Sequence, residues 1–216
     1  YELQPGVWDL KYRQTFGSYF NFRSQVWSGD AAFYVQTGEV ADQDLNAWYG
    51  SASLSHQITS TWNTRIGAEY LSGSSFRSQK NRSFSPLFGN GHAFNGFMDY
   101  FYAGNHQSSV GLVDVYANMG FHKARWSGQV IPHYFVSAAD LNPDPTTDYS
   151  RYLGTEVDLI VTYAVAPDIR ISAGYSHMFG SESLEFLRGG DHDRTQNFAW
   201  LMVRVKPRLL HWKGNS

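Results

Sequence analysis

Apolar and polar residues alternate with a period of two along most of the chain, and helical periodicity is scarce. In the stretch 111–121, Val113 and Val115 share one face while Asp114 and Asn118 share the other. Side chains of a β-strand point alternately to the two faces of a sheet, so this pattern predicts strands that are apolar on one side. We expect about ten strands, in the ranges 6–16, 18–27, 31–38, 46–57, 64–73, 111–121, 125–138, 152–165, 168–177 and 197–206. Pro132 cannot donate a ladder hydrogen bond, which predicts a bulge or a locally unpaired strand at its position.

The lengths of the segments and of their connections favour a membrane-spanning barrel over a soluble β domain. Most segments are near the 9–11 residues that a tilted strand needs to cross a bilayer, whereas the mean globular strand has about 5–6. Outer-membrane barrels alternate short turns on one side with long loops on the other. The predicted connections alternate in this way: "SGDA", "TSTWN", "HKA" and "APD" are short, while "GEVADQD", the stretch 73–109, "DLNPDPTTDYS" and "GSESLEFLRGGDHDRTQ" are longer.

Composition further narrows the classes of protein to which the chain can belong. The net charge of −2 gives no reason to expect a nucleic-acid partner, and the absence of cysteine excludes a disulfide scaffold and Cys-based metal sites. Aromatic residues make up 17% of the chain, yet no run of about 18 apolar residues predicts a transmembrane helix. The first ten residues lack the basic and apolar regions of a signal peptide. We therefore expect an all-β fold, an antiparallel transmembrane β-barrel with residues 1–216 in a single domain.

The polar faces of the predicted strands carry many charges of both signs. A small closed core would not accept them, because buried unpaired charges are prohibitive, whereas a water-filled lumen does. The alternative is a mixed charge ladder that only solvates and stiffens the wall. We expect these charged residues to line a pore: Lys11, Arg13, Arg23, Arg65, Glu69, Asp114, Glu156, Asp158, Arg170, Arg204 and Lys206.

The stretch 87–101, "LFGNGHAFNGFMDYF", suits neither a helix nor a strand. Its glycines permit tight bends, its aromatic rings supply packing area, and its polar residues stay hydrated. We expect this part of the 73–109 loop to fold inward as a constriction or plug; the alternative is a lid over the rim without a gating role. The constriction would be formed by Phe88, His92, Phe94, Asp99 and Tyr100.

Two groups of residues raise the question of catalysis or metal binding. Asp191, His192 and Asp193 could bind a hard cation, but neighbours in sequence do not easily converge on one ion, which favours a solvated turn. His92 and Asp99 could act as an acid–base pair, but nothing nearby supplies a nucleophile. We expect no catalytic residues, no metal site and no cofactor.

Several stretches resemble, in order, the alginate export family of outer-membrane barrels. They are "AAFYVQTGEV", "GAEYLSGSS", "SPLFGNGHAFNGFMDYF", "YLGTEVDLIVTYAVAPDIRISAGYSHMF" and "NFAWLMVRVKPRLL". Family members are about twice as long, with barrels of up to 18 strands, so the resemblance implies that this chain is the C-terminal half. Either the family pattern is truncated here, or an N-terminal portion precedes Tyr1. The ending "HWKGNS" departs from the terminal aromatic residue that is typical of outer-membrane proteins.

The resemblance implies a Gram-negative outer-membrane protein in contact with membrane lipid and lipopolysaccharide. It also implies passive passage of a polyanionic saccharide through a pore lined by Arg and Lys. We expect a channel for a polar saccharide, anionic or neutral, or for a small polar solute. Two alternatives remain open. One is a structural barrel subunit without an open pore, bound to outer-membrane or periplasmic partner proteins; the other is an outer-membrane enzyme.

Overall fold

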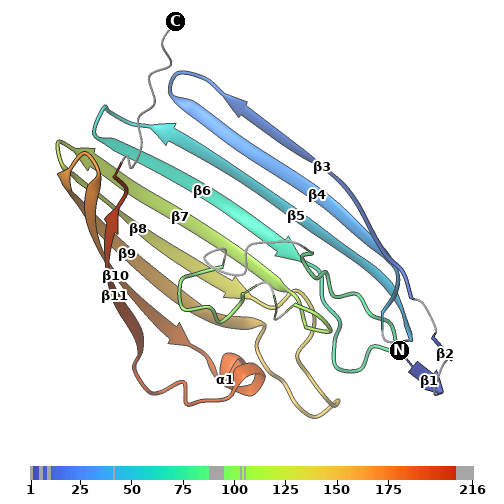
Figure 1. The fold of residues 1–216 in the computed structure, drawn as a ribbon. Coiled ribbons are helices and arrows are strands. Elements are labelled where there is room, and N and C mark those ends of the chain that lie inside the picture. The colour runs from blue at the N-terminus through green and yellow to red at the C-terminus, as the bar shows by residue number, and fades with distance from the viewer. Residues whose placement is uncertain are drawn as a thin grey trace, which may run out of the picture.

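The computed structural model describes residues 2–4, 7–8, 11–40, 42–87, 95–102, 104 and 106–207. Nine antiparallel strands form one sheet in which every strand pairs with its neighbours in sequence (Figure 1), and this confirms the predicted all-β antiparallel fold. The strands are β3 (Arg13–Arg23), β4 (Trp27–Val40), β5 (Gln43–Gln57), β6 (Trp62–Leu71), β7 (Leu112–Lys123), β8 (Trp126–Val136), β9 (Tyr152–Ala166), β10 (Ile169–Gly180) and β11 (Gln196–Val205). A separate pair, β1 (Glu2–Gln4) and β2 (Val7–Trp8), precedes the sheet, and one helix, α1 (Glu182–Arg188), lies between β10 and β11.

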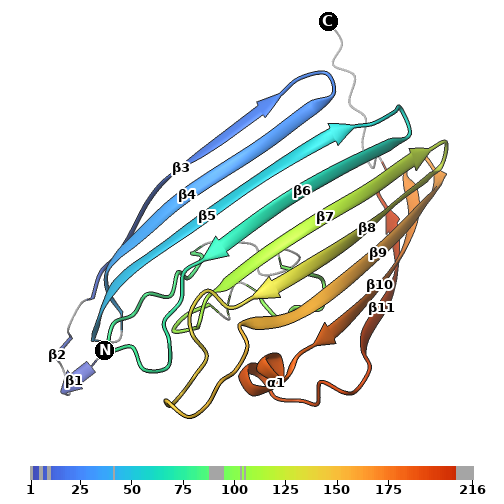
Figure 2. The ribbon, with the colours of Figure 1, turned by 180° about the vertical axis from the view of Figure 1, so that it is seen from behind.

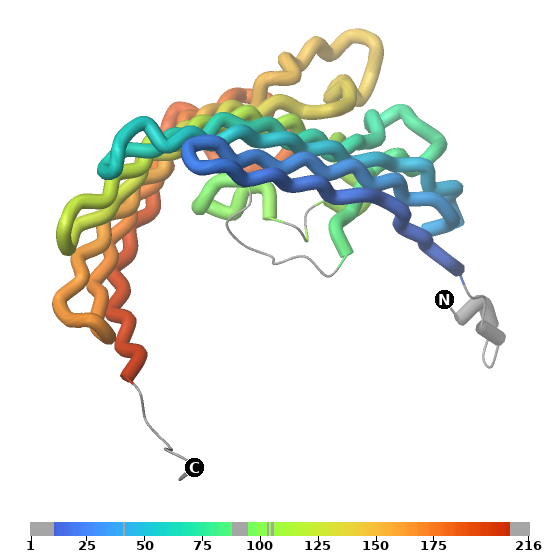
Figure 3. Tube along the Cα trace, turned by 90° about the horizontal axis from the view of Figure 1, so that it is seen from above, coloured from blue at the N-terminus to red at the C-terminus, as the bar shows by residue number. Residues whose placement is uncertain are grey.

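The sheet is strongly arched and is not closed. Viewed from above, it curves around a concave side, on which part of the connection between β6 and β7 lies (Figure 3). Strands β3 and β11 are the two edges of the sheet (Figures 1 and 2). The described part of the chain contains no helix that is long and apolar enough to span a bilayer.

The large sheet has nine strands, one fewer than the ten predicted segments. The segments 6–16 and 18–27 were expected to be separate, but β3 runs through both and pairs continuously with β4 from Arg13 to Arg23. The alternation keeps one phase across Gly17, so nothing in the chain stops the strand there. The turn comes later, where the Ser24 hydroxyl accepts a hydrogen bond from the Trp27 amide at 3.1 Å. The stretch "SGDA", expected to be a turn, therefore lies inside β4.

The two ends of the sheet differ in their connections. At one end, tight connections of two to four residues join β3 to β4, β5 to β6, β7 to β8, and β9 to β10 (Figure 1). We call this the short-turn end. At the opposite, loop end lie the connections 72–111, 137–151 and 181–195. The prediction of a long connection at "GEVADQD" is wrong. Val40 pairs with Gln43, and Asp42 takes the positive φ of 61° that a two-residue hairpin needs.

Alternation gives the sheet two different faces. The convex face carries large apolar side chains that remain exposed: Phe16, Phe20, Phe33, Trp48, Leu54, Ile66, Val115, Leu159, Val161, Ile171, Leu201, Val203 and Val205. The concave face is mainly polar at the same strands, with Gln36, Ser51, Glu69, Asp114 and Glu156 on it. The buried apolar core is small. It lies at the loop end, where Leu71, Leu112, Phe135 and Leu153 meet residues from the loops.

Pro132 interrupts the ladder between β7 and β8 as expected. Pairing runs to Tyr116 and His133, is missing for the next two positions, and resumes at Met119 and Val130. The register is the same on both sides of the gap, so the strand is locally unpaired and has no bulge there. On its other side, Pro132 pairs with Val157 of β9.

Candidate functional site

The connection 72–111 between β6 and β7 packs on the concave face through hydrogen bonds to three strands. The Asn95 amide donates to Glu69 on β6 and to Asp114 on β7, the latter at 3.2 Å. The backbone amides of Phe97 and Met98 both donate to Glu156 Oε1 on β9, at 2.6 and 2.9 Å. These three carboxyl groups therefore position the loop across β6 to β9.

A second set of bonds fixes the earlier part of the same connection. The buried Gln36 side chain of β4 accepts from the Ser85 amide at 3.0 Å and donates to the Ser85 carbonyl at 2.8 Å. The Phe84 amide donates to the carbonyl of Ser72 at 2.9 Å, and the Phe84 ring packs 5.3 Å from that of Tyr49. The described parts of the connection therefore contact both halves of the sheet.

A buried polar cluster lies beneath residues 95–98. Asp114, Glu156 and Asp158 are each 0% exposed. His133 lies between two of them, with Nδ1 2.9 Å from Asp114 Oδ2 and Nε2 3.8 Å from Asp158 Oδ2. Glu156 Oε2 and both carboxylate oxygens of Asp158 have no hydrogen-bond partner, which makes this cluster costly to maintain. Within the described residues, no group of three or more His, Asp or Glu side chains is arranged to hold a metal ion.

Gly96 fits against this cluster because it has no side chain. Its φ is +82°, and a Cβ atom there would lie 2.6 Å from the carboxyl carbon of Glu156. The glycine thus allows the backbone to bend sharply and to approach the carboxylate closely. A glycine is therefore needed at this one position of the loop.

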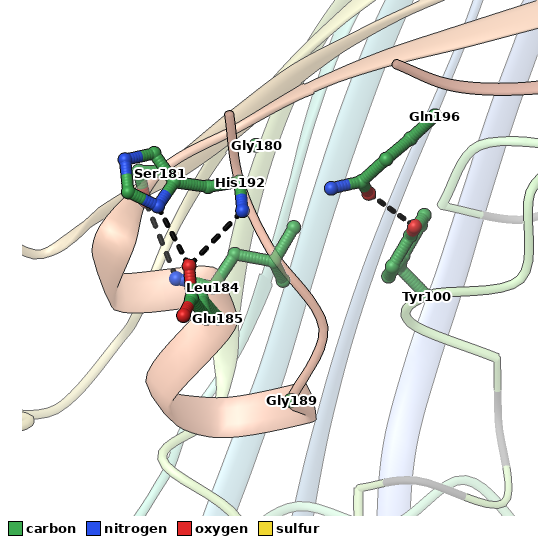
Figure 4. Close-up of a pocket in the computed structure, with 8 residues that line it drawn as sticks. All are labelled: Tyr100, Gly180, Ser181, Leu184, Glu185, Gly189, His192 and Gln196. Carbon is green, nitrogen blue, oxygen red and sulfur yellow. Dashed lines mark hydrogen bonds and ion pairs between the residues drawn. The ribbon is translucent and has the colours of Figure 1, made fainter. Parts of the chain in front are cut away.

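The charge states of the loop residues depend on burial. Burial, with a smaller contribution from the positive charge of Arg188, lowers the pKa of His106 to about 4, so the imidazole is neutral near pH 7. Its Nε2 lies 3.1 Å from the Phe101 carbonyl, which a neutral ring can bind as a donor. Burial also raises the pKa of Tyr100, with a smaller contribution from Glu156. The Tyr100 hydroxyl donates to Gln196, the first residue of β11 (Figure 4).

A cavity of about 950 Å³ lies on the concave face beside this loop. Tyrosines contribute much of its wall, and Arg65 and Asp30 form an ion pair of 2.8 Å within it. The loop closes one side with Pro86, Leu87, Asn95 and Phe97. Further wall residues come from β3 to β8: Thr15, Tyr19, Tyr34, Gln36, Tyr49, Ser51, Glu69, Tyr116, Asn118, Ile131 and His133.

The structure divides the eleven residues expected to line a pore into three groups. Asp114, Glu156 and Asp158 are buried under the loop instead of facing open water, and Glu69 is bonded to Tyr49 and Asn95. Two others are paired: Arg65 with Asp30, and Lys11 with Glu39 at 2.7 Å and Asp42 at 3.3 Å. The remaining five form no ion pair within the part of the chain that the structure describes: Arg13, Arg23, Arg170, Arg204 and Lys206.

The expected constriction residues are described only in part. Phe88, His92 and Phe94 lie outside the described residues, and so does one half of the His92–Asp99 pair. Asp99 and Tyr100 belong to the described loop, and both are partly buried.

The acidic stretch 191–193 lies in a turn that is held by its own bonds. His192 Nδ1 lies 2.7 Å from Glu185 Oε2 on α1 (Figure 4). Arg194 Nε donates to Asp191 Oδ2 at 2.9 Å. The helix α1 was not predicted from the sequence. The signals were present, because Ser181 accepts from Leu184 as the N-cap and Gly189 follows the last helical residue.

The tyrosine wall of the cavity was not predicted from the sequence either. Tyr34, Tyr49 and Tyr116 occupy polar-face positions, and the alternation alone predicts no role for them. The signal that could have identified them was the presence of aromatic rings on the polar phase of neighbouring strands. Their grouping, however, depends on strand register, which a single sequence does not give.

Comparison with known proteins adds no assignment to this site. No protein-family model matches the chain, and no curated protein matches it. The fold and the geometry of the concave face therefore carry the functional argument.

Proposed function

We propose that the chain is part of an outer-membrane β-barrel channel of a Gram-negative bacterium, through which polar solutes, saccharides among them, diffuse passively. One observation carries the proposal: the sheet has an exposed apolar convex face and a polar concave face with a large cavity. In water, such an apolar face would be an aggregation liability, whereas acyl chains and the lipid part of lipopolysaccharide would cover it.

The directions of the edge strands support a barrel larger than the nine strands. Both β3 and β11 run from the loop end to the short-turn end, because they are the first and last of an odd number of antiparallel strands. If they paired with each other, the pair would be parallel. An antiparallel barrel therefore needs an odd number of further strands between them, which agrees with the even totals of bacterial outer-membrane barrels.

Aromatic residues near the short-turn end support the same placement. Trp27, Trp62 and Trp126 lie at the ends of β4, β6 and β8, and each is between 42% and 51% exposed. Tryptophan side chains favour the boundary between acyl chains and headgroups. In the proposed orientation, the short turns face the periplasm and the loops face outward.

The loop on the concave side supports a channel whose lumen is narrowed. It is attached to β4, β6, β7 and β9, so in a closed barrel it would narrow the lumen beside the cavity. A second candidate is a structural barrel subunit without an open pore. The close packing of Phe84, Phe101 and Phe135 at the loop end favours it.

Planar-bilayer recording separates the two candidates. The protein, extracted from outer membranes in its native assembly, should insert and give stepwise ion conductance. Replacing Asn95 with Ala removes its bonds to Glu69 and Asp114, and this should raise the conductance or make it noisy. Asn142→Ala, in a different loop, is the control and should leave the conductance unchanged. Absence of conductance despite insertion would overturn the channel and favour the structural subunit.

A further inference from the structure

We propose that the cavity on the concave face is a binding site for an uncharged saccharide whose rings stack on tyrosine side chains. This deepens the proposed function and rests on it, since it takes the cavity to be a stage on the path of the solute. The volume of about 950 Å³ lies within the range of small-molecule sites, roughly 300–1,000 Å³.

Two tyrosine rings lie directly over glycines of the adjacent strand. Tyr34 pairs with Gly17, and a Cβ atom on Gly17 would lie 2.1 Å from Tyr34 Cδ1. Tyr116 pairs with Gly67, and a Cβ atom there would lie 2.5 Å from Tyr116 Cζ. Each ring thus occupies the space of the missing side chain and lies low on the sheet. Because both residues also line the cavity, each ring presents a surface to it.

Further tyrosines extend this aromatic surface across the sheet. Tyr49 lies 5.8 Å from Tyr34, between ring centroids, and its hydroxyl is fixed by a bond to Glu69. Tyr19 on β3 is 57% exposed and lines the same cavity. A pyranose ring has an apolar C–H face that packs on such surfaces, while tyrosine hydroxyls and nearby polar groups bind its hydroxyls.

The polar groups of the cavity suit hydroxyl groups better than a charged ligand. Asp30 and Arg65 neutralise each other, and Ser53 donates to the same Asp30 oxygen at 2.7 Å. Both charged side chains keep part of their surface accessible, so they can accept from and donate to neighbouring hydroxyls. Ser51 and Asn118 add further groups that donate and accept.

The charge of the cavity disfavours an anionic ligand. Arg65 is the one Arg or Lys side chain among the described residues that line it, and Asp30 already occupies it. Glu69 lies in the same wall, and the buried Asp114, Glu156 and Asp158 lie nearby on β7 and β9. A carboxylated sugar would therefore find no unpaired Arg or Lys in the described wall, and leaving its charge without a partner costs binding energy. The site differs in this respect from the Arg-lined and Lys-lined pore that the sequence resemblance implies.

Isothermal titration calorimetry on the purified full chain tests the proposal. The probes are two neutral hexasaccharides, maltohexaose and cellohexaose, and a charged one of the same length, hexagalacturonate. At least one neutral probe should bind, and the charged probe should bind at least tenfold more weakly. Tyr34→Ala and Tyr116→Ala should each weaken neutral binding about tenfold, whereas Tyr116→Phe should keep most of it.

Trp200→Ala supplies the matched control. Trp200 pairs with Gly174, and a Cβ atom on Gly174 would lie 2.3 Å from the indole, yet Trp200 does not line the cavity. This variant removes the same kind of ring-over-glycine packing, so it should affect folding similarly and leave saccharide binding unchanged.

The calorimetry and the conductance recording test the saccharide site and the channel separately. Equal or tighter binding of hexagalacturonate, binding of none of the three probes, or an equal loss in Trp200→Ala would overturn the saccharide site. Conductance without neutral-saccharide binding would leave the channel standing and refute the site. Saccharide binding without conductance would support the site and refute the channel.

Discussion

The convex and concave faces of this sheet are built from the same nine strands, yet they differ in almost every respect. On β9, Leu159 is exposed on the convex face while its neighbour Asp158 is completely buried on the concave face. The convex face carries mainly apolar side chains, whereas the concave face holds ion pairs, a loop and a cavity. On an apolar surface, one apolar side chain can replace another at little cost. On the polar surface, each side chain has a particular hydrogen-bond or ion-pair partner. We therefore expect the convex face to be sensitive to an added charge and the concave face to the loss of a single partner.

The largest expected effect is the introduction of a charge on the convex face. Leu159→Arg or Val203→Arg should lower the free energy of unfolding in lipid vesicles by about 2–4 kcal/mol, because an arginine would enter the acyl region. Denaturant titration in vesicles measures it. Met202→Arg is the matched control, since Met202 is the neighbour of Val203 on the other face and is 46% exposed. A cost near zero for both convex variants would count against contact with lipid.

On the concave side, acidic pH should loosen the 72–111 connection. The pKa of His106 in the folded protein is about 4, below its ordinary value of 6.5, mainly because the ring is buried. Between these values the unfolded loop binds more protons than the folded loop. The stability that His106 contributes is therefore complete above pH 6.5 and falls by about 3 kcal/mol as the pH drops to 4.

Hydrogen exchange of the Phe84 and Ser85 amides between pH 7 and 4 measures this loosening once the intrinsic exchange rate is corrected. His106→Gln keeps a donor for the Phe101 carbonyl but does not titrate, so its protection should depend less on pH. His122→Gln, at an exposed histidine, should behave as the wild type does. An unchanged pH dependence in His106→Gln would refute the role of this residue.

A smaller loss of stability is expected at Gly96, where backbone strain and the contact with Glu156 can be told apart. Gly96→Ala forces a residue with a side chain into φ +82° and places its Cβ against Glu156, which should cost roughly 2 kcal/mol. Gly190→Ala shares a positive φ, +101°, but has no atom within 4 Å of the new Cβ, so only the strain remains. Exchange rates of the Phe97 and Met98 amides should rise in the first variant only. Equal behaviour of the two variants would show that the carboxylate contact is unimportant.

The smallest expected effect lies in the exposed turn after α1. The hydrogen bond to Glu185 raises the pKa of His192, and the same contact lowers the pKa of Glu185. The pair therefore stabilises the turn between these two values. It weakens as the pH rises through the raised value of His192 and as the pH falls through the lowered value of Glu185.

Amide exchange of His192 and Asp193 across pH 3 to 9 should show maximal protection in the middle of this range. Glu185→Gln should flatten the profile, whereas Glu182→Gln, on the same helix, should largely preserve it. A flat profile in the wild type would mean that the contact does not persist in solution.

Much of the architecture could be predicted from the sequence because strand alternation is a local property. The backbone fixes a period of two, so positions such as Val115 and Leu159 could be assigned to an apolar face without knowing the strand partners. The long connection between β6 and β7 was also recognisable, since its glycines and asparagines break both periodicities. The ends of the strands were predicted less well. Gly17 and "SGDA" were predicted to interrupt strands, but both lie inside strands that pair continuously with their neighbours.

Only the tertiary structure decided which polar residues meet. Glu69, Asp114 and Glu156 come from three strands, and the Asn95–Met98 segment is what joins them into one cluster. The sequence predicted that these carboxylates would face water, but Asp114 and Glu156 are completely buried and Glu69 is half-buried. The same holds for the rings of Tyr34 and Tyr116 over Gly17 and Gly67, which require one particular register between strands. Register and loop docking depend on contacts between residues far apart in sequence. No local pattern of hydrophobic and polar positions contains that information.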